Sequence, residues 1–309
     1  MRFHDDPVID RIFRDIAEDN TSGASVLFQQ TFALFPRMAE LLEKQGKQQI
    51  KPFLQDIVRI LVSLQPGMAP FVHLARYIEN FINGKFQKKV IINAFRAFPL
   101  AAERLIEKQK RSILKTASQE LGNCRRLLTH SRSSLVERFL RSWLAEDEKR
   151  EIFATESRPI REGIQLLEAL QELPNRKICL VDDARGLALT KVDAVVIGSD
   201  RICETKMLNK IGTYALAVLA REKGVPVYVL ADGSKLIPAK MCRRKERMHP
   251  ADEVINPRKG IKVMNYYFEE VPNDFFRFIT ADGVLDASEI RARFQQGKWE
   301  MFCFEEREG

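Results

Sequence analysis

The stretch Val192–Asp232, VDAVVIGSDRICETKMLNKIGTYALAVLAREKGVPVYVLAD, decides the fold. It begins with a short β-branched run that ends at Gly198-Ser199-Asp200-Arg201, as a buried parallel strand does where it enters a polar loop. Apolar residues then recur at helical spacing: Ile211, Tyr214, Ala215, Val218 and Leu219. Gly224 and Pro226 end this helix, and Val227–Leu230 forms a second strand. The order strand, loop, helix, strand predicts one right-handed crossover whose ligand binds outside the carboxyl ends of the strands.

The same alternation extends over the carboxyl-terminal part of the chain. Strand-like runs occur at Arg126–Thr129, Glu151–Ala154, Lys177–Val181, Asp193–Ile197 and Val227–Leu230. Amphipathic segments separate them, which predicts an α/β fold with a doubly wound, mainly parallel sheet and helices on both faces. In the tail, an Asp-Gly turn and Ser288 before a charged helix indicate a packed closing segment.

The amino-terminal part has helical spacing and hardly any strand signals. Helices are expected at about Ser25–Leu42, Ile50–Leu64, Pro70–Ile82 and Phe86–Leu121, after a first one around Ile9–Ile16. We therefore expect a helical domain over residues 1–120 and a ligand-binding α/β domain over residues 121–309.

The composition favours a globular, cytoplasmic protein. Of 309 residues, 45% are hydrophobic and 30% charged, and no apolar run approaches the roughly 18 residues that span a bilayer. The first residues contain acids and no apolar core of a secretory signal. Five cysteines without a short paired spacing argue against disulfide staples and zinc knuckles. No ligand spacing indicates a metal site, and no cofactor is expected.

The net charge of +8 has two interpretations. Much of the excess lies in two clusters: Lys108, Lys110, Arg111 and Lys115, and Lys240, Arg243, Arg244, Lys245 and Arg247. They indicate either solvated faces that attract small anionic ligands, or contacts with nucleic acid or the translation machinery. No recognised nucleic-acid motif accompanies either cluster.

Polar groups follow every predicted strand. They are Thr129-His130-Ser131-Arg132-Ser133-Ser134, Thr155-Glu156-Ser157-Arg158-Pro159, Asp182-Asp183, Gly198-Ser199-Asp200-Arg201 and Asp232-Gly233-Ser234-Lys235, with Asn209-Lys210 at the start of the next helix. In a parallel sheet these loops share one edge, so their hydroxyls, carboxylates and cations should converge. Hydroxyls, helix amides and basic side chains bind phosphate, so the predicted ligand is small, hydroxylated and phosphorylated.

Each group also has a structural interpretation. Asp200 is equally suited to cap a turn, and Asn209 and Lys210 to provide a helix cap and a surface charge. Arg158 has Glu156 as a nearby ion-pair partner. His130 is also compatible with a structural role in the core, and Cys203 with an ordinary buried thiol. Ser131, Ser133 and Ser134 are residues that commonly start a helix.

Seven segments resemble the superfamily that joins methylthioribose-1-phosphate isomerase, ribose-1,5-bisphosphate isomerase and the alpha, beta and delta subunits of translation initiation factor 2B. They are TSGAS (21–25), LLTHSRSS (127–134), TESRP (155–159), VDAVVIGSDRI (192–202), NKIGTYALAVLA (209–220), VPVYVLAD (225–232) and NYYFEEVP (265–272). The resemblance implies a helical amino-terminal domain, a Rossmann-like carboxyl-terminal domain, and a homodimer or larger assembly built on the latter.

The resemblance also implies roles for single residues. The isomerases use a cysteine and an aspartate, and their aspartate motif matches Gly198–Ile202, so Asp200 takes the acid/base role. Their phosphate-binding residues match Arg158, Asn209 and Lys210. The TSGAS loop adds a further ligand-facing segment: Ser22, Gly23 and Ala24.

One position departs from the isomerases. Ser131 stands where the catalytic cysteine follows Thr-His, and a hydroxyl needs an adjacent base to carry a proton near neutral pH. Two functions therefore stay open. The first is a regulatory protein of the initiation factor 2B type that binds a phosphorylated sugar or nucleotide with weak or no isomerase activity. The second is an active aldose-ketose isomerase that uses Asp200 and Ser131 on a ribose-1-phosphate-like substrate.

Overall fold

The chain forms two compact units in a computed structural model, which describes residues 6–18, 24–64, 69–241, 248–256, 258 and 260–302. One unit contains residues 1–108, 234–243 and 299–309, and the other contains residues 109–233 and 244–298. We refer to them as the helical unit and the sheet unit. The predicted boundary at residue 120 lies within the long helix α6 (Lys88–Leu121), whose residues the two units share.

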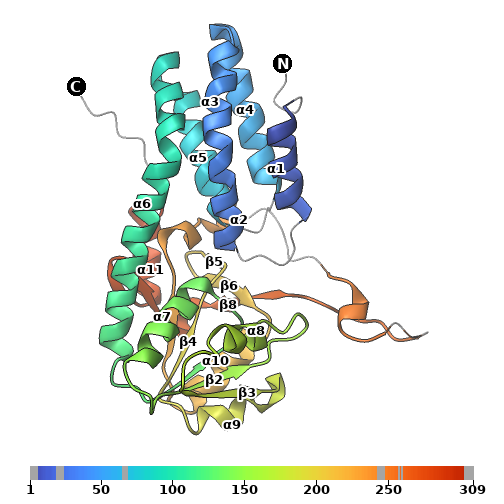
Figure 1. Cartoon of the computed structure of the whole chain (residues 1–309), viewed down its shortest axis with the longest axis vertical. Coiled ribbons are helices and arrows are strands. Elements are labelled where there is room, and N and C mark those ends of the chain that lie inside the picture. The colour runs from blue at the N-terminus through green and yellow to red at the C-terminus, as the bar shows by residue number, and fades with distance from the viewer. Residues whose placement is uncertain are drawn as a thin grey trace. The chain divides into compact units, whose positions relative to one another are not determined.

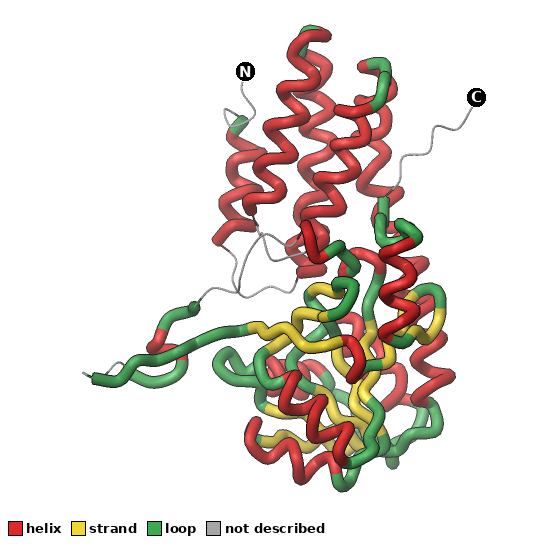
Figure 2. The backbone as a smooth tube through the Cα atoms, turned by 180° about the vertical axis from the view of Figure 1, so that it is seen from behind, coloured by secondary structure: helices red, strands yellow, loops and turns green. Residues whose placement is uncertain are grey.

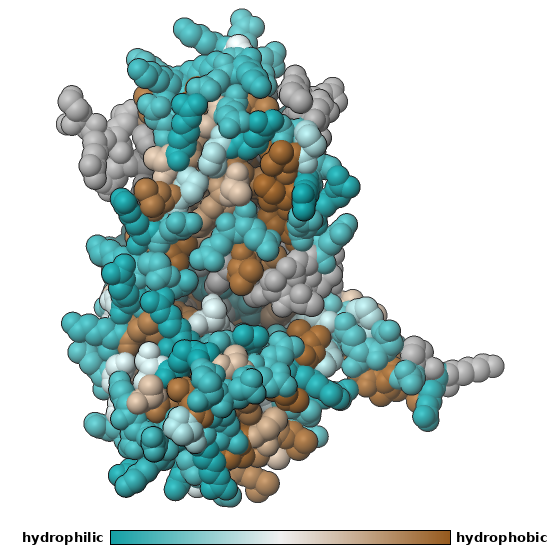
Figure 3. Space-filling model, viewed as in Figure 1, coloured by the Kyte–Doolittle hydropathy of each residue, from teal (hydrophilic) through white to brown (hydrophobic). Residues whose placement is uncertain are grey.

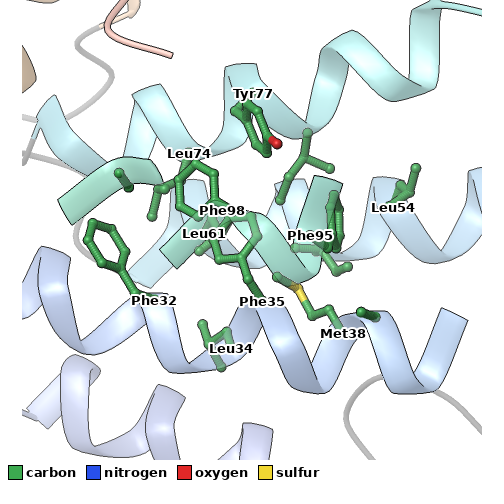
Figure 4. Close-up of a cluster of buried hydrophobic side chains, with 14 of the residues drawn as sticks. Phe32, Leu34, Phe35, Met38, Leu54, Leu61, Leu74, Tyr77, Phe95 and Phe98 are labelled. Carbon is green, nitrogen blue, oxygen red and sulfur yellow. The ribbon is translucent and has the colours of Figure 1, made fainter. Parts of the chain in front are cut away.

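The helical unit is built from α-helices (Figure 1), but the helix predicted over Ser25–Leu42 is divided into two by a 3-10 turn at Thr31–Ala33. Before α6 these are α1 (Pro7–Glu18), α2 (Ala24–Gln30), α3 (Leu34–Lys44), α4 (Lys47–Leu64) and α5 (Ala69–Asn83). Their apolar faces meet in an aromatic-rich core, which Figure 4 shows in close-up. Phe35 stacks on Phe98 with ring centroids 3.9 Å apart and meets Phe95 edge-on at 5.4 Å. Such pairs add to the stabilisation that burial of the rings provides.

The sheet unit contains a seven-stranded sheet in the order β10-β9-β7-β4-β1-β2-β3. Its strands are β1 (Arg126–Thr129), β2 (Glu151–Thr155), β3 (Arg176–Leu180), β4 (Ala194–Ile197), β7 (Val227–Leu230), β9 (Arg277–Thr280) and β10 (Gly283–Leu285). Neighbouring strands pair in parallel except β10 with β9. The five predicted strands are all present, and Figure 2 shows that the strands gather in this unit. The predicted fold class is confirmed.

Helices cover both faces of this sheet. Alternate strand residues point to opposite sides, so Leu127 and Leu128 belong to different cores. One face packs against α9 (Arg185–Leu189) and α10 (Thr213–Glu222). The other packs against the end of α6, α7 (Ser134–Ala145) and α8 (Glu162–Ala169). This two-sided burial explains why the strands read as nearly continuous apolar runs.

A second sheet interrupts the predicted crossover. Between β4 and α10 the chain forms β5 (Arg201–Ile202) and β6 (Lys206–Lys210), and β6 pairs antiparallel with β8 (Phe268–Pro272). The crossover therefore contains a hairpin that the sequence analysis did not predict. The closing segment is packed as expected, but helix α11 (Ala287–Gln295) is capped by Asp286 rather than Ser288, through a capping box with Glu289.

Within the described residues, no helix combines the length and the apolarity that a membrane span requires. Hydrophilic residues cover most of the face of the molecule in Figure 3.

Candidate functional site

The carboxyl ends of β1 and β2 are joined by a chain of buried hydrogen bonds around His130. The ring Nε2 lies 2.8 Å from the carbonyl oxygen of Ile211, which can only accept, so Nε2 carries the proton. Nδ1 then accepts from the hydroxyl of Thr155 at 2.6 Å. Burial lowers the pKa of His130 to about 4, so the ring is neutral at pH 7. His130 is thus a structural histidine with both nitrogens engaged.

The loop after β1 is held by the loop after β2. The backbone N–H of Ser131 donates to the hydroxyl oxygen of Ser157 at 2.7 Å. Both serines adopt positive φ angles, 67° for Ser131 and 61° for Ser157, a conformation rare for residues other than glycine. Asp182, which follows β3, accepts from the N–H groups of Ser157 at 3.0 Å and Arg158 at 2.8 Å. Three strand ends are thereby tied together in one network.

A buried ion pair completes this edge of the sheet. Lys210 Nζ lies 2.5 Å from Glu162 Oε2, and the two side chains are only 1% and 18% exposed. The hydroxyl of Ser131 is within hydrogen-bonding reach of the same carboxylate, and Asp200 is near enough for its charge to act on it. Ser131, Glu162, Asp200 and Lys210 therefore form one polar cluster, which we call the strand-end cluster.

The strand-end cluster combines charges with aromatic faces. Lys210 Nζ lies 4.9 Å from the ring centroid of Tyr267 and 5.2 Å from that of Phe268. These rings attract the ammonium group and offer flat apolar surfaces beside it. Burial raises the pKa of Glu162, and the charge of Asp200 raises it further, while Lys210 and Ser131 act in the opposite direction. A carboxyl group adjusted in this way beside a hydroxyl is typical of a ligand-binding or acid/base site.

A comparison with protein families identifies the relationship of this chain. The model of the initiation factor 2 subunit family matches residues 21–287. The chain belongs to this family.

Relatives within the family carry two kinds of name. An eIF-2B subunit 2-like protein of Pyrococcus furiosus is 26% identical over 282 residues, which cover 89% of this chain and 95% of the relative. A ribose 1,5-bisphosphate isomerase of Methanocaldococcus jannaschii is 24% identical over 285 residues, covering 90% and 91%. The crystal structure of translation initiation factor eIF-2B from Pyrococcus horikoshii superimposes with a TM-score of 0.74 at 23% identity, over 91% of this chain and 98% of that one.

Two predicted site residues of this family member lie on a different element from the one expected. Asn209 and Lys210 are the last residues of β6 rather than the start of a helix, and α10 begins at Thr213 after Gly212. The Asn209 side-chain amide donates to the hydroxyl of Thr213 at 3.0 Å. The helix pattern begins so soon after Lys210 that it conceals the strand, which the pairing with β5 and β8 defines.

The amino end of α10 is already occupied by a carboxylate. Glu269 Oε1 accepts from the N–H of Gly212 at 2.7 Å and from the N–H of Tyr214 at 2.9 Å. These are the donors that a phosphate would use at a helix N-terminus. Phosphate binding at this helix end therefore requires Glu269 to be displaced.

The other predicted residues are placed as follows. Arg158 does not pair with Glu156 in any described contact; its guanidinium donates to the carbonyl of Val254 at 3.2 Å. Ser22 and Gly23 lie outside the described residues, and Ala24 begins α2 in the helical unit. The sheet unit alone thus supplies the geometry of the strand-end cluster.

Two of the described cysteines, Cys124 and Cys203, lie away from the strand-end cluster. Cys203 is buried in the turn between β5 and β6, about three residues or roughly 10 Å along the hairpin from Asp200. Cys124 precedes β1 and therefore lies at the opposite end of that strand from Ser131. Cys179 lies one residue before the end of β3, and burial, together with the charges of Glu156 and Asp182, raises the pKa of its thiol.

Glu162 is the site residue that the sequence analysis missed. A single acid in the first turn of a helix usually complements the helix dipole, so its position gave no particular signal. Its neighbour Gly163 explains the position of Glu162 in the structure, because a Cβ at residue 163 would lie 1.8 Å from the carbonyl oxygen of Thr155. This close approach brings Glu162 against the strand ends.

Among the described residues, no group of three His, Cys, Asp or Glu side chains could hold a metal ion.

Proposed function

We propose that this chain is a regulatory protein of the initiation factor 2B subunit type that binds a phosphorylated sugar or nucleotide and has weak or no isomerase activity. The observation that carries the proposal is the polar cluster at the strand ends, which has acids, a buried ammonium and a hydroxyl but, among the described residues, no thiol. Such a set supports recognition of a hydroxylated ligand. Proton transfer to carbon at neutral pH is a harder task for an aliphatic hydroxyl.

In this proposal Asp200 and Ser131 occupy the positions of the catalytic pair, and Arg158, Asn209 and Lys210 contact the ligand. In the same proposal, Ser22, Gly23 and Ala24 contact the ligand. The protein forms homodimers or larger assemblies through residues 121–309. Lys210 is buried beside an acidic side chain and two aromatic rings. This position supports a role in ligand binding rather than that of a surface charge.

One observation favours the second candidate, an active aldose-ketose isomerase. The carboxylate of Glu162 lies within reach of the Ser131 hydroxyl, so the hydroxyl has a neighbouring base. Glu162, whose pKa is raised by burial, and Asp200 would then serve as the two acids of the proton transfer. Against this candidate, Glu162 is paired with Lys210.

Incubation of the purified protein with methylthioribose 1-phosphate and with ribose 1,5-bisphosphate distinguishes the regulatory protein from the isomerase. We expect a ligand-dependent rise in the unfolding temperature without ketose product. Turnover that disappears in Asp200→Asn would instead establish the isomerase. Light scattering of the same samples tests the homo-oligomer, and RNA binding at several salt concentrations tests the role of the basic clusters.

A further inference from the structure

The Lys210–Glu162 pair combines opposite charges at a buried position. Lys210 Nζ is in ionic contact with Glu162 at 2.5 Å, and this contact engages one of its donors. An ammonium group has three N–H donors. A buried donor without an acceptor is unfavourable unless a ligand or ordered water supplies one. The pair therefore has hydrogen-bonding capacity left for a ligand.

The charge balance around Lys210 determines which ligand group can approach it. Glu162 offsets the positive charge of Lys210, and Asp200 adds a second negative charge nearby. A phosphate group placed at Lys210 would face both carboxylates at short range, in surroundings where charges interact more strongly than in water. Uncharged hydroxyl groups meet no such repulsion.

The other neighbours suit hydroxyl groups as well. Glu162 and Asp200 offer acceptors, Lys210 offers donors, and Ser131 offers both. Sugar hydroxyls donate and accept, so this mixed set matches them better than it matches a phosphate, which mainly accepts. The rings of Tyr267 and Phe268, about 5 Å from Lys210 Nζ, provide an apolar surface against which a sugar ring can pack.

We infer that Glu162 determines ligand specificity at Lys210: the Lys210–Glu162 pair binds the uncharged hydroxyl groups of the ligand and excludes its phosphate. The phosphate then binds away from this pair. This inference deepens the proposed ligand site and rests on it, and it changes the expected partner of Lys210 from phosphate to sugar hydroxyls.

The test measures sulfate binding to the full chain by titration calorimetry. Sulfate has the shape and charge of a phosphate dianion, and Glu162→Gln removes the negative charge while it keeps the size of the side chain. We expect Glu162→Gln to bind sulfate about tenfold more tightly than the wild type, because Lys210 is no longer neutralised. The double variant Glu162→Gln/Lys210→Gln should lose this gain. Glu168→Gln, an equal change at an exposed position of the same helix, should match the wild type.

Two results would overturn the inference. One is sulfate affinity in Glu162→Gln that stays within about twofold of the wild type, a difference too small to reflect a removed charge. The other is a wild-type sulfate site that Lys210→Gln abolishes. Glu162→Ala removes the same charge with different packing, so it replaces Glu162→Gln if that variant does not fold. The assay contains no sugar, so its outcome stays distinct from a failure to bind phosphorylated sugars.

Discussion

The imidazole of His130 donates from Nε2 to the carbonyl of Ile211 at 2.8 Å and so connects the end of β1 to the loop between β6 and α10. This bond fixes the segment that follows Lys210 relative to the segment that contains Ser131. Two parts of the strand-end cluster, about eighty residues apart in the sequence, are held in register by one neutral ring.

The buried state of His130 predicts a loss of stability in acid. Its pKa is about 4 in the folded protein, below the ordinary 6.5, so the unfolded chain binds a proton first as the pH falls. The free energy of unfolding should therefore decrease between about pH 6.5 and pH 4, by roughly 3 kcal/mol in total from this residue. Urea unfolding of the wild type and of His130→Gln at several pH values measures the difference.

His249 provides the control for this pH dependence. Its ring stacks on that of Tyr267 with the ring centroids 3.5 Å apart, and it belongs to the sheet unit, as His130 does. The variant His249→Gln should keep the slope of the wild type between pH 6.5 and pH 4. An equal slope in His130→Gln and the wild type would show that other groups cause the acid sensitivity.

The contact between Gly163 and Thr155 predicts that adding one methyl group at residue 163 lowers the stability strongly. A Cβ at residue 163 would lie 1.8 Å from the Thr155 carbonyl oxygen, so α8 and β2 would have to separate. We expect Gly163→Ala to destabilise the protein by about 3 kcal/mol or more and to weaken ligand binding through Glu162. Gly186→Ala in α9 has no atom within 4 Å and should be neutral or slightly stabilising. Thermal unfolding of the two variants compares them directly.

The two hydrogen bonds that Asp182 accepts predict a loss of stability that is smaller than that of Gly163→Ala. Its two carboxylate oxygens accept from the N–H groups of Ser157 and Arg158, and an asparagine retains only one of these acceptors. Asp182→Asn should lower the free energy of unfolding by about 1–3 kcal/mol. Asp183→Asn, an adjacent change at an exposed residue, serves as the matched control. Equal stabilities of the two variants in urea unfolding would contradict the role of Asp182.

Five strands of the main sheet could be predicted from the sequence, and four of them, β1, β2, β4 and β7, are almost entirely buried, whereas β9 and β10 were not predicted. β1 and β7 have the predicted ends, and β4 differs by one residue. The small sheet could not be predicted, because β6 contains Lys206 and Lys210 and β8 contains two glutamates. Such strands lack a continuous apolar run, and their pairing is non-local.

The strand-end cluster was predictable in part for the same reason. Parallel strands place their carboxyl ends at one edge, so the strand-end loops with Ser131 and Asp200 were expected to converge, and both residues act on Glu162. Glu162 itself was not predictable, since its position depends on the close packing of Gly163 against β2. The tautomer of His130 likewise depends on a carbonyl eighty-one residues away in the sequence.

The final prediction concerns Ser131 and the proposed loss of isomerase activity. A thiol at this position has an ordinary pKa near 8.5 and can carry a proton at neutral pH, which a hydroxyl does poorly. Ser131→Cys should therefore increase turnover of methylthioribose 1-phosphate or ribose 1,5-bisphosphate by about 10²-fold over the wild type. Ser134→Cys adds an exposed thiol to the same region and should leave turnover unchanged. Alkylation of the thiol should abolish the gain in Ser131→Cys. A wild type that turns over either substrate as fast as Ser131→Cys does would show instead that Ser131 and Glu162 already suffice for catalysis.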